Sequence, residues 1–398
     1  MTKEKNYKKT LIACYLGFIT QAIATNFAPL LFLTFQGSFG IPLDRIALIP
    51  MVFYLTQLLV DLVAARVADA IGYRICVVIS QAISAAGLIL LAILPSLLPD
   101  PFVGIMLSVV LYAIGSGLIE VLISPIVEAC PFANKAGVMS LLHSFYCWGA
   151  VGVILGSTLF FAIFGMPAWR ALALIWALLP LINAFHFLSC PIERLNGEGE
   201  SLPASQLFRL PRFLLLVVLM ICAGACEATM AQWASAFTES ALGVSKTVGD
   251  LAGPCLFATL MGLARVFYGK YSERLDLSRV MLVCGLLCLS CYLLAALSPI
   301  PFFGLVGCAL CGLSVGVMWP GTLSISSRQC PRGGTAMFAI LALAGDLGAT
   351  VSPAMVGAIA EGAGGSLQTG LLFAIIFPVV MIFGLILLVR GKARPCRG

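Results

Sequence analysis

Long apolar stretches separated by short polar ones run along the whole chain. A helix that crosses a membrane needs about 20 mostly apolar residues. The pattern predicts twelve such helices, at residues 9–36, 44–66, 73–95, 102–130, 135–163, 169–189, 212–241, 247–271, 278–298, 301–327, 333–361 and 366–390. Most of the breaks between them carry the Gly and Pro residues that favour turns. We therefore predict an all-α membrane protein with twelve transmembrane helices.

The composition excludes a soluble enzyme. Of all residues 61% are apolar and 10% are charged, whereas soluble domains usually carry about 25% charged residues. A soluble globule of this composition would expose large apolar patches and aggregate. The net charge of +6 comes from residues in short loops between the apolar runs. That distribution is typical of a chain in a lipid bilayer, so we expect no nucleic acid partner.

The longest polar stretch lies in the middle of the chain. It predicts an N-terminal six-helix bundle at residues 1–189, a cytoplasmic linker at 190–211 and a C-terminal six-helix bundle at 212–398. If the N-terminus is cytoplasmic, 20 of the 23 Lys and Arg residues fall on the cytoplasmic side, and only Arg45, Arg170 and Lys246 fall on the other. Cytoplasmic loops of membrane proteins carry such an excess. We expect both termini in the cytoplasm.

Two further features bear on the source and the cysteine chemistry. The sequence contains no Asn-x-Ser/Thr acceptor for N-glycosylation, which favours a bacterial cytoplasmic membrane. Most of the 15 cysteines lie inside apolar runs, where cysteine acts as a small hydrophobic residue. The pairs Cys288/Cys291 and Cys308/Cys311 have zinc-like spacing but lack nearby histidine. We predict no disulfide, no metal and no cofactor.

The two halves resemble each other as a parallel repeat, in which four pairs of segments match at nearly constant offsets. The pairs are Gln21/Asn26 with Glu227/Gln232 (offset 206), Gly117–Glu120 with Gly316–Trp319 (199), Asn134–Met139 with Arg332–Met337 (198), and Asp61/Asp69 with Arg265/Glu273 (204). The repeat predicts two pseudo-symmetric bundles.

The repeat and one loop motif resemble the major facilitator superfamily. Its signature between helices 2 and 3 reads Gly-x-x-x-Asp-Arg-x-Gly-Arg-Arg/Lys, and here Asp69, Gly72 and Arg74 match it. A second copy keeps its glycine, acid and arginine at Gly269, Glu273 and Arg274. In the family this motif latches the cytoplasmic side in the outward-open state. We therefore assign to a cytoplasmic gate Asp61, Asp69, Arg74, Arg265, Glu273 and Arg274.

Several short stretches are similar to the fucose/glucose/galactose–proton symporter branch of that superfamily. They are Gly117–Glu120 with Ser124-Pro125, Leu142–Phe145 with Gly149, Glu227 with Trp233, and Met318-Trp319-Pro320. Some members carry an acidic residue on helix 1, where this chain has Gln21 and Asn26. The resemblance implies transport of a monosaccharide together with a proton.

Ionisable residues inside predicted helices are candidates for function, because each costs roughly 2.5–3.5 kcal/mol in a membrane. They are Glu120, His143, Glu227 and Asp346; the alternative for each is a structural contact between helices. Glu120 and His143 lie roughly 15 and 12 Å from the cytoplasmic ends of their helices at 1.5 Å rise per residue. A short loop joins those helices, so we predict that the two side chains form a proton-coupling pair.

A second group of residues is predicted to bind the solute. Carboxylates and amides hydrogen-bond sugar hydroxyls, and a tryptophan ring stacks on a sugar ring. We expect a common water-filled passage between the two bundles, lined by Gln21, Asn26, Glu227, Gln232, Trp233, Trp319 and Asp346.

These residues favour a secondary active transporter that works by alternating access. No nucleotide-binding motif is present, so a gradient of protons or sodium would drive it. The alternatives are an exporter of drugs or metabolites, a receptor, and a membrane enzyme. A receptor would normally need a large soluble domain, and an enzyme would need more than two histidines or other clustered catalytic groups. We expect a monomer that carries a small-molecule substrate and is no enzyme.

Overall fold

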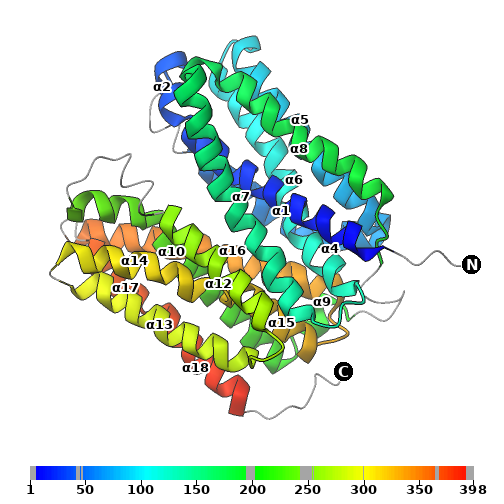
Figure 1. The fold of residues 1–398 in the computed structure, drawn as a ribbon, viewed down its shortest axis with the longest axis vertical. Coiled ribbons are helices and arrows are strands. Elements are labelled where there is room, and N and C mark those ends of the chain that lie inside the picture. The colour runs from blue at the N-terminus through cyan, green and yellow to red at the C-terminus, as the bar shows by residue number, and fades with distance from the viewer. Residues whose placement is uncertain are drawn as a thin grey trace, which may run out of the picture. The chain divides into compact units, whose positions relative to one another are not determined.

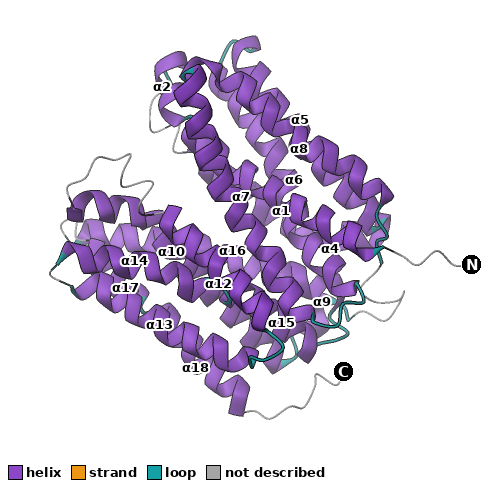
Figure 2. Ribbon diagram, in the orientation of Figure 1, coloured by secondary structure: helices purple, strands orange, loops and turns teal. Residues whose placement is uncertain are grey.

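The computed structural model describes residues 6–41, 45, 48–193, 202–242, 253, 255–298, 300–363 and 367–390. The regular secondary structure of this described part is helical throughout (Figure 2). The prediction of an all-α fold is confirmed.

Helices follow one another along the chain with short connections (Figure 1). The N-terminal ones are α1 (Tyr7–Leu30), α2 (Phe32–Phe39), α4 (Leu48–Ile71), α5 (Tyr73–Leu97), α6 (Pro101–Ala129), α7 (Lys135–Phe164), the 3-10 turn η1 (Met166–Ala168) and α8 (Trp169–Ser189). The C-terminal ones are α9 (Ala204–Leu207), α10 (Pro211–Leu242), α12 (Leu256–Tyr271), α13 (Leu277–Leu297), α14 (Pro301–Val315), α15 (Met318–Gln329), α16 (Gly334–Gly362), α17 (Leu367–Ala374) and α18 (Ile376–Arg390).

Ten helical segments within the described residues are long and apolar enough to cross a membrane. The helices α4 and α12 fall in the two remaining segments for which the sequence predicts a span. Each of the twelve predicted segments therefore contains helix in the structure.

Within the described residues, three of these segments consist of two helices rather than one. The interruptions fall at Leu31, at Gly316–Val317 and at Ile375. Pro320 and Pro378 stand in the first turn of the helix that follows two of these breaks. Proline has no N–H to donate to the carbonyl four residues earlier. The missing bond leaves the carbonyl oxygen of Gly316 free for another donor.

The chain divides into two compact units. Unit 1 comprises Met1–Pro131 and Trp148–Gly199, and unit 2 comprises Phe132–Cys147 and Glu200–Gly398. The continuous helix α7 thus begins in unit 2 and ends in unit 1. The sequence-based division into an N-terminal bundle, a linker and a C-terminal bundle stays a prediction.

In unit 1, helices α5 and α6 pack closely through small residues. A Cβ added at Gly87 would lie 2.6 Å from the backbone nitrogen of Tyr112, and one at Gly104 would lie 2.7 Å from the carbonyl carbon of Leu94. Small residues let membrane helices approach backbone to backbone, which gains van der Waals contact where no hydrophobic effect acts between helices. The two helices therefore form a fixed frame on which α1 and α4 pack.

In unit 2, helices α10 and α16 make the corresponding close pair. A Cβ added at Gly224 would collide with the carbonyl oxygen of Gly345, and one at Gly348 would collide with that of Ile221. The hydroxyls of Thr229 and Ser352 hydrogen-bond across the same seam. This pairing fixes the position of α10 along the axis of α16.

The α10–α16 seam generates a stability prediction. Because overpacking a tight interface typically costs about 1–3 kcal/mol, Gly348→Ala should lower the free energy of unfolding. The midpoint of thermal unfolding in detergent measures this loss. The matched control is Gly362→Ala in the same helix, where a new Cβ meets no atom within 4 Å. Equal midpoints for the two variants would contradict the packing described here.

Candidate functional site

A carboxylate in unit 1 is held by two amide side chains. Glu120 lies on α6, and its Oε2 atom accepts a hydrogen bond of 2.8 Å from Nε2 of Gln21 on α1. The Nε2 atom of Gln57 on α4 donates to the same oxygen. Both glutamines are buried, whereas Glu120 is partly accessible. Three helices therefore converge on one partly accessible carboxylate.

Two neighbours of this group were also predicted to be functional. Asn26 donates through Nδ2 to the carbonyl oxygen of Ala22, 2.9 Å away on its own helix. Asp61 is buried on α4, one turn beyond Gln57. The predicted solute role of Asn26 and the predicted gate role of Asp61 stay predictions.

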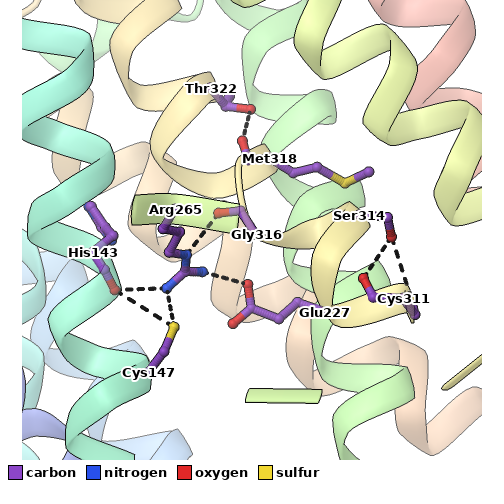
Figure 3. Close-up of polar contacts among 9 residues, drawn as sticks. All are labelled: His143, Cys147, Glu227, Arg265, Cys311, Ser314, Gly316, Met318 and Thr322. Carbon is purple, nitrogen blue, oxygen red and sulfur yellow. Dashed lines mark hydrogen bonds and ion pairs between the residues drawn. The ribbon is translucent and has the colours of Figure 1, made fainter. Parts of the chain in front are cut away.

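A buried arginine forms the second polar group, which lies in unit 2. The side chain of Arg265 on α12 is 3% exposed. Its Nη2 atom lies 3.1 Å from Oε2 of Glu227 on α10, whose side chain is 21% exposed, and the two form an ion pair. The pair joins two helices and has one end that remains partly accessible, the carboxylate (Figure 3).

The other nitrogens of Arg265 bind backbone and sulfur atoms. Nε donates to the carbonyl oxygen of Gly316 at 2.8 Å. Nη1 donates to the carbonyl oxygen of His143 at 2.9 Å and to Sγ of Cys147 at 3.1 Å. Each guanidinium nitrogen therefore has an acceptor, as a buried charge requires.

The acceptor at Gly316 exists because of the break between α14 and α15. Pro320 cannot donate to the Gly316 carbonyl, so that oxygen has no partner in its own helix. Arg265 supplies the missing donor. Broken helices with free carbonyls often bind cations in transporters, and here the cation is a side chain of the protein itself.

The first half of α7 is tied to α12 by further contacts. Asn134 caps α7 by accepting from the Gly137 backbone nitrogen at 2.9 Å, and its Nδ2 atom donates to Oγ of Ser272 at 2.6 Å. Ser140 donates through Oγ to the carbonyl oxygen of Arg265 at 2.8 Å. Together with the bond from Arg265 to the His143 carbonyl, these contacts make a continuous seam.

Two further residues predicted to bind solute, Trp319 and Asp346, lie on α15 and α16 of unit 2. A Cβ added at Gly345 would collide with the indole ring of Trp319, so that ring packs on the backbone of α16. Asp346 follows Gly345 directly and is partly accessible. Gly345 has no side chain, and this absence makes room for the ring of Trp319.

The residues predicted for a cytoplasmic gate lie in different settings. Arg74 donates through Nη1 to the carbonyl oxygens of Phe187 at 3.3 Å and Leu188 at 2.7 Å, near the end of α8. Glu273 and Arg274 are exposed just after α12. Arg265 instead lies in the buried ion pair described above. The gate assignment stays a prediction.

Some predicted residues cannot be placed further. The side chains of Asp69, Gln232 and Trp233 lie outside the described residues. Glu120 belongs to unit 1 and His143 to unit 2, so their pairing stays a prediction.

Sequence reasoning missed Gln57 and the Gly316 carbonyl. Gln57 stands in an apolar run four residues before Asp61, so a search for amides one helical turn from a carboxylate could have found it. The sequence contains Pro320, which has no N–H. The carbonyl of Gly316, four residues earlier, could therefore have been predicted to lack a donor within its own helix. That Arg265 fills this position required the structure.

A comparison with protein-family models identifies one family. A family model described as Major Facilitator Superfamily matches residues 13–256 and 242–396. Among curated protein sequences, none matches significantly.

Solved structures of transporters share the fold. The E. coli fucose:proton symporter FucP (N162A) superposes with a TM-score of 0.79 at 15% identity, over 96% of this chain and 98% of that one. The proton:xylose symporter XylE gives 0.82 at 11% identity, over 97% and 96%. The human organic anion transporter MFSD10 gives 0.75 at 16% identity, over 96% and 100%.

The buried ion pair generates a prediction about stability. Arg265→Met leaves Glu227 without its counter-ion and Gly316 without its donor, so the free energy of unfolding should fall by about 3–5 kcal/mol. Adding Glu227→Gln should restore part of this loss, because no carboxylate is then left unpaired. Thermal unfolding of the single and double variants measures both effects. Arg274→Met, at an exposed arginine, is the control; if Arg265→Met were as stable as that control, the pair would be unimportant.

Proposed function

Because the chain belongs to the major facilitator superfamily, we propose that this multi-pass membrane transporter moves a small polar solute, such as a monosaccharide, by alternating access. We propose a proton as the coupling ion. We further propose that the protein acts as a monomer in a bacterial cytoplasmic membrane, with both termini cytoplasmic.

The observation that carries the choice of solute is the group formed by Glu120, Gln21 and Gln57. A carboxylate held by two amides presents both acceptors and donors. Sugar hydroxyls can satisfy both kinds at once, since each donates and accepts. An amphipathic drug would instead favour a pocket lined mostly by apolar side chains. The amides also hold the carboxylate in one position, which reduces the ordering cost of binding.

The proposed proton coupling rests on carboxylates inside helices. Glu120 and Glu227 are partly accessible, so a proton can reach either of them. Ionisable side chains at such positions commonly carry protons in transporters. Two structural neighbours are described as a fucose:proton and a proton:xylose symporter, and this description favours the same ion here.

The choice between sugar and other solutes can be tested by ligand stabilisation. A solute present at about 100 times its dissociation constant should stabilise the purified protein by about 2.7 kcal/mol. We expect monosaccharides to raise the midpoint of thermal unfolding, and the same sugars to exchange by counterflow in proteoliposomes. If only drugs or organic anions stabilise the protein, an exporter replaces the proposal.

The role of Glu120 can be tested with an isosteric substitution. Glu120→Gln keeps the size of the side chain and removes its charge, so uptake against a gradient should no longer respond to an imposed pH difference. Flux of radiolabelled sugar into proteoliposomes, with and without that difference, measures the response. Asp100→Asn at the N-cap of the same helix preserves the hydrogen bond that Asp100 accepts from Phe102 and should behave as wild type. A wild-type pH response in Glu120→Gln would exclude Glu120 from coupling.

A further inference from the structure

Arg265 is bonded at the same time to a partly accessible carboxylate and to the backbone of α7. The carboxylate is Glu227, and the backbone atom is the carbonyl oxygen of His143. The same side chain donates a hydrogen bond to the carbonyl oxygen of Gly316, which has no donor in its own helix. A change at Glu227 therefore reaches α7 through a single side chain.

The section of α7 that Arg265 binds is a distinct part of that helix. Residues Phe132–Cys147 belong to unit 2, and the helix continues from Trp148 into unit 1. Besides Arg265, the attachment depends on the contact between Asn134 and Ser272 and on close backbone packing. A Cβ at Gly137 would lie 2.7 Å from the carbonyl oxygen of Gly269. These contacts are neutral, whereas the ion pair contains a carboxylate that a proton can neutralise.

We propose that Glu227 is a proton-accepting residue whose protonation releases Arg265 and thereby detaches the first half of α7 from α12. This inference rests on the proposed proton-coupled transport and deepens it. It adds a coupling residue to the predicted pair of Glu120 and His143.

The step conserves charge and atoms. A proton from water adds to a carboxylate oxygen of Glu227, which becomes a neutral acid. Arg265 remains a cation and loses its counter-ion. A buried charge without a partner is unfavourable, so the guanidinium leaves its site and gives up the carbonyl oxygens of His143 and Gly316. Loss of the proton reverses the sequence.

Among the residues that the structure describes, the counter-ion of Arg265 is Glu227. The ionisable groups that interact with Arg265 are Cys147, Tyr146 and His143 on α7 and Glu227 on α10. At the break between α14 and α15, Arg265 donates a hydrogen bond to the carbonyl oxygen of Gly316. Within this set the carboxylate is that of Glu227, which supplies the negative charge of the ion pair.

The attachment of α7 can be measured without knowing the solute. Asn134→Cys and Ser272→Cys place two thiols at the seam, where the native side chains lie 2.6 Å apart. A short thiol-specific bifunctional reagent then joins them at a rate that reports how often the seam is closed. A protease site placed in the linker separates the halves on a denaturing gel unless the cross-link holds them. Single-cysteine variants show the background from native cysteines.

Glu227→Gln mimics the protonated acid. At neutral pH it should cross-link more slowly than the parent by at least about fivefold, the low end of typical coupling between sites. The matched control is Asp276→Asn, because Asp276 caps α13 at an exposed position and asparagine caps equally well. An unchanged rate in Glu227→Gln would overturn the proposal.

A second measurement covers the case in which Glu227→Gln does not fold. Hydrogen–deuterium exchange of residues 135–147 in the wild-type protein, corrected for the intrinsic effect of pH, should be faster at mildly acidic than at neutral pH. Equal protection at both would overturn the proposal. Neither the cross-linking nor the exchange assay involves sugar. If both gave the expected result but the protein showed no sugar counterflow, the proposed solute would be rejected and the proposed role of Glu227 would remain.

Discussion

A buried positive charge is the constraint on which the organisation of unit 2 depends. Arg265 is 3% exposed and must find acceptors for its guanidinium nitrogens among the helices around it. It finds a carboxylate on α10, a carbonyl left without a helix partner by Pro320, and a carbonyl on α7. Each of these acceptors fixes one neighbouring element relative to α12. The break between α14 and α15 and the attachment of α7 are therefore parts of one arrangement.

In unit 1, the carboxylate of Glu120 accepts hydrogen bonds from neutral side chains. Gln21 and Gln57 donate to Glu120 through neutral amide groups. A neutral amide donor stabilises a carboxylate less strongly than an arginine does. The two units thus hold carboxylates in different settings, one bound by two amides and one ion-paired with an arginine.

The sequence predicted the helices, whereas the contacts of Arg265 required the structure. Hydropathy, together with Gly and Pro at the breaks, marks the spans, because membrane thickness sets their length. The repeat matched Arg265 to Asp61 and so assigned it to the gate, although the structure pairs it with Glu227. Contacts between side chains of different helices depend on how each helix is rotated and on close backbone contacts such as that of Gly224 with Gly345. Residue spacing along one helix determines neither the rotation nor the close contacts.

The most direct test of this account is an electron cryo-microscopy map of the protein in lipid nanodiscs at neutral pH. The account predicts density for the Arg265 guanidinium that is continuous with the Glu227 carboxylate and lies within hydrogen-bond distance of the carbonyl oxygens of Gly316 and His143. A map in which the Arg265 side chain points away from Glu227, with the Gly316 carbonyl bound to another group, would contradict it.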